Sequence, residues 1–164
     1  MIDPKEIKNK IFSKEHIYSL AIIVIIFTLD RYSKIQIITD FSSGTFYIND
    51  FINFDLVWNT GIGFGLFSSG SSILYNLITF IIGIVILILF FVNFKSKNIE
   101  KIIFSIIIGG AVGNFYDRIY FKAVPDFIDL HLNNFHWFTF NVADIFISLG
   151  IITFLLRGFF IKTN

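Results

Sequence analysis

Four long apolar runs, separated by polar segments, dominate the chain. They cover about residues 17–38, 73–94, 102–121 and 140–161. Each run approaches the ~20 residues that a helix needs to cross the hydrocarbon core of a bilayer. The pattern therefore predicts an all-α membrane protein with four transmembrane helices, built as a single domain over residues 1–164.

The longest polar stretch, residues 39–70, has a different pattern. Short runs rich in Phe, Ile, Val and Trp are punctuated by Ser-Gly and Thr-Gly pairs, which is typical of strands joined by turns. The alternating glycines of N-T-G-I-G-F-G (59–65) allow close approach to a ligand or another strand, or they only serve turns. We expect a small extracytoplasmic β-rich segment between the first and second helices.

The positive charges predict an orientation for these helices. Most of the 13 Lys and Arg lie before residue 17, in 95–101 and near the C-terminus. The positive-inside rule then predicts that both termini are cytoplasmic. Segments 39–70 and 122–139 would lie outside, beside the outer ends of all four helices. Because no small-residue cleavage site follows the first run, we expect it to be retained rather than removed as a signal peptide.

Composition excludes several classes of protein. With 55% hydrophobic and 15% charged residues, the chain is too apolar for an ordinary soluble domain. A net charge of +1 gives no case for binding nucleic acid. The absence of Cys excludes disulfides and a cysteine nucleophile. The three His show no metal-binding spacing, so the sequence predicts neither a metal site nor a cofactor.

The run G-G-A-V-G-N-F-Y-D-R (109–118) places polar groups where the third helix nears the outer surface. Polar and charged groups at membrane depth are costly, so their clustering indicates a functional site. Gly109 and Gly113 would let another helix pack closely. Asn114 shares a helix face with Asp117 and Arg118, and we expect the latter two to form a charge-compensating pair.

Asp30 and Lys34, at the outer end of the first helix, form a second expected pair. Their i,i+4 spacing places them on one helix face. Either the pair only neutralises itself at the membrane surface, or it contributes directly to the site.

Two further acids, Asp126 and Asp144, flank the 122–139 connection. They can meet if this connection folds back as a hairpin between antiparallel helices. Two close carboxylates do not both ionise readily, so such a pair holds a shared proton. One member can activate water while the other protonates a leaving amine. The alternative is that Asp144 only completes a capping box with Asn141, and that Asp126 is an ordinary loop carboxylate.

Five motifs resemble, in the same order, those of lipoprotein signal peptidase. They are L-D-R-Y-S-K, N-T-G-I-G-F-G, G-G-A-V-G-N-F-Y-D-R, V-P-D-F-I-D and F-N-V-A-D, and they cover nearly the whole chain. The resemblance implies an aspartic endopeptidase of the bacterial inner membrane. Such an enzyme cuts diacylglyceryl-modified prolipoproteins just before the lipid-modified cysteine. We expect a monomer that meets membrane lipids and these substrates, and no nucleic acid.

The resemblance also implies residue roles. It identifies Asp126 and Asp144 as the catalytic pair. The residues that it implies for substrate binding and support are Asp30, Lys34, Asn59, Gly61, Gly109, Asn114, Asp117, Arg118, Asn141 and Ala143. The family usually has Gln at Arg31, Ala at positions 62 and 63, and Gly at 122 or 123, which leaves local packing open.

Two other classes of function remain as alternatives. A small proton-coupled transporter also keeps carboxylates among its helices, but along a path across the bilayer rather than at one end. A non-catalytic assembly factor would explain the small-residue helix contacts, but not two acids that flank a short connection.

Overall fold

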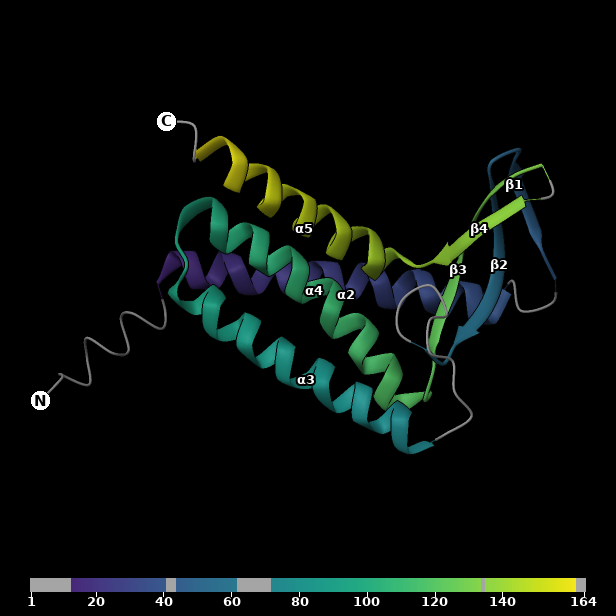
Figure 1. The fold of residues 1–164 in the computed structure, drawn as a ribbon, viewed down its shortest axis with the longest axis horizontal. Coiled ribbons are helices and arrows are strands. Elements are labelled where there is room, and N and C mark those ends of the chain that lie inside the picture. Colours follow the sequence, from purple (N-terminus) through teal and green to yellow (C-terminus); the bar gives the residue numbers. More distant parts are fainter. Residues whose placement is uncertain (1–12, 41–43, 62–71, 134, 162–164) are drawn as a thin grey trace, which may run out of the picture.

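Four long helices and a four-stranded sheet make up the described part of the computed structural model, which covers residues 13–40, 44–61, 72–133 and 135–161. The helices are α2 (Lys14–Asp40), α3 (Ser72–Lys95), α4 (Asn98–Tyr120) and α5 (Val142–Ile161). The strands are β1 (Phe46–Asn49), β2 (Ile52–Asn59), β3 (Val124–Leu132) and β4 (Phe135–Phe140). The helices form a bundle, and the sheet lies at one end of it (Figure 1).

Helix α4 is the central element of the bundle and contacts α2, α3 and α5. About 44% of the most apolar 18-residue stretch of α4 is buried, against 11% of the corresponding stretch of α3 and of α5. Its glycines permit this position. A Cβ on Gly109 would lie 2.8 Å from the Cβ of Ile26, and Gly113 lies directly against Asp30 of α2. The prediction that Gly109 and Gly113 allow close helix packing is confirmed.

The sheet draws strands from both outer connections. It is antiparallel throughout, in the order β1-β2-β3-β4. The prediction of strands between the first two helices is confirmed by β1 and β2, but it was too narrow, because the connection between α4 and α5 supplies β3 and β4. Pairing with β2 lets this short connection satisfy its backbone groups as a hairpin. Residues 41–43 and 62–70 of the predicted β-rich segment lie outside the described residues.

Three of the described helices are long and apolar enough to cross a membrane: Ile73–Lys95, Asn98–Tyr120 and Val142–Phe159. The predicted first span, 17–38, does form a helix, α2, but it does not meet this criterion. Its C-terminal half carries Asp30, Arg31 and Lys34, which lower its apolar character. The structure therefore supports a helical membrane protein with three candidate spans in its described part.

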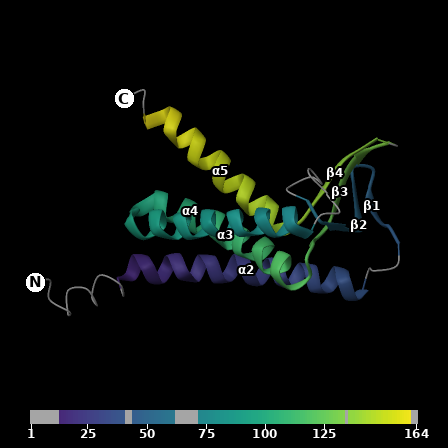
Figure 2. The same cartoon turned by 60° about the horizontal axis from the view of Figure 1, so that its bottom comes forward.

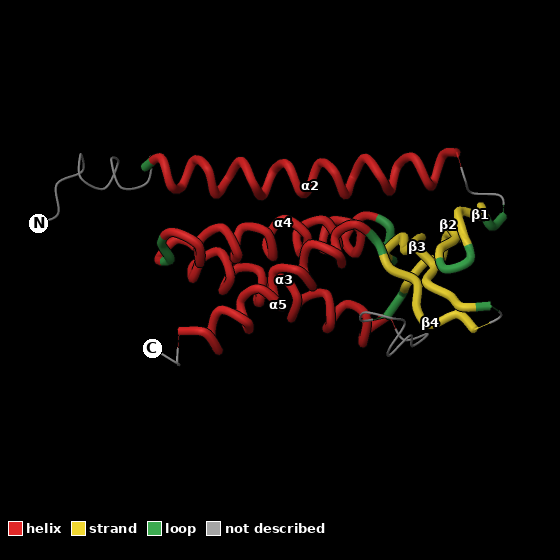
Figure 3. Tube along the Cα trace, turned by 90° about the horizontal axis from the view of Figure 1, so that it is seen from above, coloured by secondary structure: helices red, strands yellow, loops and turns green. Residues whose placement is uncertain are grey.

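The helices all have one end near the sheet and one end away from it (Figures 2 and 3). The start of α2, the α3–α4 connection and the end of α5 all lie at the end away from the sheet (Figure 1). The polar connections of the bundle are thus sorted between its two ends.

A buried polar cluster joins three helices at the end away from the sheet. Ser19 Oγ of α2 donates to Asn93 Oδ1 of α3 at 2.9 Å, and Asn93 Nδ2 donates to Ser105 Oγ of α4 at 3.0 Å. Lys101 Nζ donates to the carbonyl oxygen of Asn93 at 2.6 Å, near the C-terminus of α3. Interhelical hydrogen bonds of this kind hold helices together where lipid provides no hydrophobic drive.

The turn from α4 into β3 passes through Lys122, whose φ of 58° lies in the left-handed region. Glycine adopts this conformation most readily. The resemblance indicates glycine at 122 or 123, and the backbone at Lys122 has the conformation that would favour it. The turn matters because it sets the start of β3, which carries Asp126.

Candidate active site

Asp126 lies on β3 with its carboxylate turned into the protein, and it is only 3% exposed. Both carboxylate oxygens accept a hydrogen bond from an amide. Asn141 Nδ2 donates to Oδ1 at 2.6 Å, and Asn59 Nδ2 donates to Oδ2 at 2.9 Å. Asn59 ends β2, beside β3 in the sheet, and its Oδ1 accepts the backbone N–H of Gly61 at 2.8 Å. Gly61 therefore fixes the orientation in which Asn59 donates to Asp126.

Asp144 lies in the first turn of α5, where Asn141 is the N-cap. The backbone N–H of Asn141 donates to Asp144 Oδ2, and the backbone N–H of Asp144 donates to Asn141 Oδ1, both at 3.1 Å. This reciprocal pair is a capping box, so the predicted cap is confirmed. Asp144 also has a partner outside its own helix, because Asn114 Nδ2 donates to its Oδ1 at 2.8 Å.

Asn141 contacts both acids. Its side-chain nitrogen bonds Asp126 while its side-chain oxygen and backbone bond Asp144. The hairpin of β3 and β4 thus returns the chain to the end of β2 and brings the two carboxylates to one place. The capping interpretation and the paired interpretation of Asp144 are both compatible with this geometry.

The electrostatics of Asp126 reflect this position. Burial, followed by the nearby charge of Asp144, raises the pKa of the Asp126 carboxyl from its ordinary value of 3.8 to about 6. The hydrogen bonds from Asn59 and Asn141 act in the opposite direction. Since desolvation and a like charge both disfavour ionisation, Asp126 can hold a proton far closer to neutral pH than a surface aspartate.

A buried ion network lies beneath the two acids, at the α2–α4 contact. Lys34 Nζ donates to Asp30 Oδ2 at 2.8 Å and to Asp117 Oδ2 at 2.7 Å, and none of these three side chains is exposed. The predicted Asp30–Lys34 pair is confirmed, but it is buried between helices rather than placed at the surface. Arg31 Nη1 also pairs with Asp117 Oδ1, so two cations face two carboxylates.

The predicted pairing of Asp117 with Arg118 is wrong. Consecutive residues on a helix point about 100° apart, and Asp117 turns to α2, where Arg31 and Lys34 bind it. Arg118 is buried, and its backbone carbonyl accepts the hydroxyl of Tyr75 at 3.2 Å. Its Nη1 has no hydrogen-bond partner among the described residues.

The ion network is joined to the first turn of α5 at two points. Asn114 accepts Lys34 Nζ at 2.8 Å on its oxygen while its nitrogen holds Asp144. The backbone N–H of Ala143 donates to Asp30 Oδ1 at 3.0 Å. These bonds fix the start of α5 against α2 and α4, so the buried charges position Asp144 without touching it.

Sequence reasoning missed Arg31, the second cation of this network. A signal was available, because Arg31 falls at the position where the resembled family usually has Gln. Arg31 follows Asp30 in the sequence, and the fold brings it to Asp117 of α4. Of the other expected site residues, Gly109 packs against α2 away from the carboxylates.

The arrangement can carry out acid–base chemistry on a bound amide. Two carboxylates share an asparagine, one of them has a raised pKa, and both lie where the sheet meets the ends of the helices. Coupled carboxylates with one retained proton supply a base and an acid together.

Known proteins resemble the chain over nearly its full length. A model of the signal peptidase II family matches residues 22–160. The lipoprotein signal peptidase of Pelagibacter ubique (strain HTCC1062) is 48% identical over 162 residues, which is 95% of this chain and 98% of that protein. The lipoprotein signal peptidase of Anaplasma marginale (strain Florida) is 41% identical over 145 residues, covering 87% of this chain and 84% of that one.

Solved structures agree with the sequence comparison. Two structures, each described as a bacterial membrane enzyme, match with a TM-score of 0.70 at 27% identity and cover 85% of this chain. The match covers 86% of one of those chains and 91% of the other. The chain therefore belongs to the signal peptidase II family and is a membrane-bound aspartic peptidase.

Proposed function

We propose that Asp126 and Asp144 are the catalytic pair of this peptidase and that they cut diacylglyceryl-modified prolipoproteins before the lipid-modified cysteine. The observation that carries this proposal is the shared contact of both carboxylates with Asn141. Family membership supports the prolipoprotein substrate. It gives no support to a transporter or an assembly factor.

The reaction needs one proton on the pair. The ionised carboxylate takes a proton from water as the water oxygen bonds to the scissile carbonyl carbon. The protonated carboxyl then gives its proton to the amide nitrogen as the carbon–nitrogen bond breaks. The products are a carboxyl terminus on the signal peptide and a free amine on the cysteine, and the pair again holds one proton.

The hydrogen bonds around Asp126 suit this role. Both of its oxygens already accept an amide N–H, and a protonated carboxyl oxygen still has a lone pair to accept with. A proton on Asp126 therefore weakens these bonds without abolishing them, and it can point at substrate or at Asp144. Asn59 and Asn141 hold the carboxyl in one orientation through the cycle, which limits the reorganisation needed at each step.

The remaining residues act as support in this proposal. The first turn of α5 is held by Asn114, which bonds Asp144, and by the bond from the Ala143 N–H to Asp30. Lys34 bonds Asp117 and thereby ties this turn to the ion network. Gly61 orients Asn59. Arg118 and Gly109 shape the α4 surface.

The membrane arrangement extends the proposal. All four helices cross the bilayer, including α2, whose charges are compensated within the buried network. Both termini lie in the cytoplasm, and the sheet and the two acids lie at the extracytoplasmic face. The lipid-modified substrate reaches the site laterally, and burial of its acyl chains supplies much of its binding free energy. The enzyme acts as a monomer.

The test is cleavage of a synthetic prolipoprotein peptide by the purified protein in detergent. We expect cutting at the diacylglyceryl cysteine by the wild type and loss of at least about 10³-fold in kcat for Asp126→Asn, the scale seen when one member of a catalytic unit is removed. A matched control is Asp50→Asn, because Asp50 is an exposed acid between β1 and β2 of the same sheet and bonds only Tyr47 among the described hydrogen bonds.

The peptide without its diacylglyceryl group serves as the second arm. It should be cut with a much higher KM, because the acyl burial is lost. Near-normal cleavage by Asp126→Asn would remove Asp126 from the catalytic pair, and equal KM values for the two peptides would remove the lipid from recognition.

A further inference from the structure

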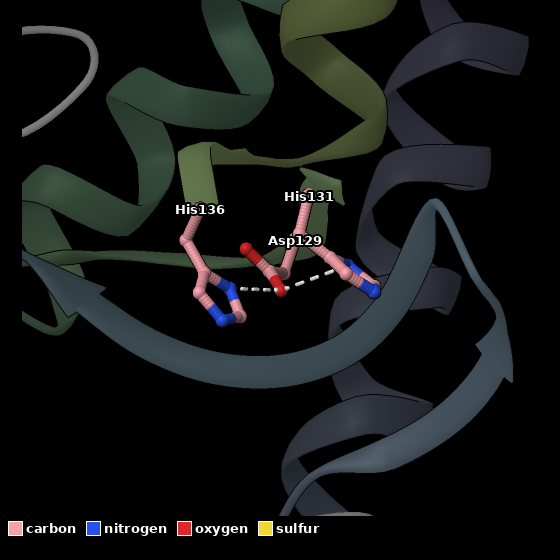
Figure 4. Close-up of side chains that lie close together, drawn as sticks. All are labelled: Asp129, His131 and His136. Atoms are coloured by element: carbon pink, nitrogen blue, oxygen red, sulfur yellow. Dashed lines mark hydrogen bonds and ion pairs between the residues drawn. The ribbon is translucent and has the colours of Figure 1, made fainter. Parts of the chain in front are cut away.

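A second polar cluster, Asp129 with His131 and His136, lies on the β3–β4 hairpin (Figure 4). The carboxylate of Asp129 lies between the two imidazoles. Its Oδ2 is 2.8 Å from His136 Nδ1 and 3.4 Å from His131 Nδ1. One ligand atom from each residue can be chosen so that all lie within 4.8 Å of one another.

The hairpin register explains why these residues meet. Asp129 and His131 are two apart on β3 and so share a face of the strand. His131 is the cross-strand partner of His136, and the two rings stack with centroids 5.3 Å apart. The spacing D-x-H-x₄-H matches no common metal motif, so only the pairing of the strands brings the three side chains together.

Two buried polar atoms at the cluster, one of His131 and one of the neighbouring Asn53, accept or donate no hydrogen bond within the described residues. His131 is only 8% exposed, and its Nδ1 has no hydrogen-bond partner in the described part of the chain. The Oδ1 of Asn53 is also buried without a partner among those residues, and Asn53 is paired with Asp129 across β2 and β3. Buried polar atoms normally have partners, and each exception requires an explanation.

We propose that Asp129, His131 and His136 bind one divalent transition-metal cation of the Zn²⁺ type. With metal–ligand bonds of about 2.0–2.1 Å, donor atoms in a tetrahedral site stand roughly 3.4 Å apart. The separation of 3.4 Å from Asp129 Oδ2 to His131 Nδ1 matches this value, the separation of 2.8 Å to His136 Nδ1 is shorter, and all three ligand atoms lie within 4.8 Å of one another. Two imidazoles and one carboxylate suit Zn²⁺, whereas Mg²⁺ and Ca²⁺ prefer all-oxygen sites.

The site has three protein ligands and one open side. His136 is 58% exposed, so a fourth position faces solvent and takes water. The cluster lies on the opposite face of β3 from Asp126, because the two acids are three residues apart on a strand. A bound metal joins β3 to β4 at the tip of the hairpin and does not touch the acids of the proposed peptidase site. This inference is therefore independent of the proposed function.

The test is a calorimetric titration of the full chain, purified without a histidine tag and freed of metal by a chelator, with Zn²⁺ in detergent. We expect one Zn²⁺ per chain for the wild type and an affinity weaker by tenfold or more for His136→Gln. Because the His136 side chain is exposed, we expect His136→Gln to fold as the wild type does. His16→Gln is the matched control, since His16 is an imidazole at the other end of the bundle, and it should bind Zn²⁺ as the wild type does. Mg²⁺ should give no comparable binding.

Thermal unfolding supplies a second readout that does not involve peptidase activity. A cation that binds only the folded protein raises the midpoint by mass action. Zn²⁺ should therefore raise the midpoint of the wild type and of His16→Gln, but not that of His136→Gln or His131→Gln. If the wild type bound no stoichiometric Zn²⁺, or if both hairpin variants bound it as tightly as the wild type, the cluster would be an ordinary hydrogen-bonded group.

Discussion

At the scale of single residues, Asn141 has two roles: it is the N-cap of α5 and a hydrogen-bond donor to Asp126. It caps α5 through Asp144, and it holds Asp126 through its side-chain nitrogen. A capping residue is normally a matter of local helix stability. Here the cap also sets the distance between two acids that come from different elements, so the start of α5 and the end of the sheet are positioned by one side chain.

The raised pKa of Asp126 predicts the pH dependence of cleavage. Above about pH 6 its carboxyl loses the proton that an ordinary aspartate would have lost near 3.8, and no acid remains for the leaving amine. At lower pH the pair takes up a second proton and no base remains. The plot of kcat/KM against pH should therefore be bell-shaped, with its alkaline limb at about pH 6, and both limbs belong to the pair. A kcat/KM that stays level through pH 6 would contradict this assignment.

The buried ions predict a large loss on removing their central cation. Within the described residues, Lys34→Met leaves the buried carboxylate of Asp30 without a cation and that of Asp117 with Arg31 alone. Leaving a buried charge uncompensated costs about 3–5 kcal/mol. We expect a markedly lower unfolding midpoint and little activity, measured by thermal unfolding in detergent and by cleavage. Lys97→Met, at an exposed lysine, is the control and should change neither, and equal stability of the two variants would refute the structural role of Lys34.

At the scale of elements, glycines on two faces of α4 let α2 and α5 pack closely against it. Gly109 and Gly113 admit α2, while Gly110 admits α5, whose Ala143 carbonyl oxygen would lie 2.6 Å from a Cβ at Gly110. That neighbour is backbone in the first turn of α5 and cannot move aside as a flexible side chain can. The position of Asp144 therefore depends on a residue that has no polar side chain.

Gly110→Ala should separate α4 from the start of α5. Because Asp144 lies in the displaced turn, we expect kcat to fall by about tenfold or more and stability to fall by about 1–3 kcal/mol, the usual cost of overpacking. Cleavage kinetics and thermal unfolding measure the two effects. Gly158→Ala is the matched control on α5, where a Cβ meets nothing within 4 Å; it should keep full activity. A Gly110→Ala enzyme with unchanged kcat would show that α5 is not held in place by this contact.

The helices and strands differ in how well the sequence predicts them. The four helices, β1 and β2 were predictable because each has its own periodicity or turn residues. A hairpin over 122–139 was considered only as a condition for the two acids to meet, and its pairing with β2 was not foreseen, because β2 is distant in the sequence. The same limit explains the error at Asp117, where the neighbouring Arg118 suggested a pair and the fold supplied Arg31 and Lys34 instead.

At the scale of the whole molecule, the chain is polarised along the axis of its bundle. The sheet, whose β3 carries Asp126, lies at one end, and the start of α2, the α3–α4 connection and the end of α5 lie at the other (Figure 1). This agrees with the distribution of Lys and Arg in the sequence, which predicts the direction of insertion.

Cysteine labelling can test that direction directly, since the chain has no native Cys. Single-cysteine variants at Lys97 and at Asp50 are expressed in intact bacteria and treated with a thiol reagent that does not cross the inner membrane. We expect labelling at position 50, and labelling at position 97 only after lysis. Labelling of position 97 from outside, with position 50 protected, would reverse the proposed topology.

The most direct test of the paired mechanism is a double-mutant cycle on Asp126 and Asp144, measured as kcat for the lipidated peptide with folding verified for each variant. If the acids act as one unit, each single change to Asn removes nearly all cleavage, and the double variant is little slower than either single one. Two single variants that each retain substantial activity, with losses that multiply in the double variant, would contradict a shared catalytic pair.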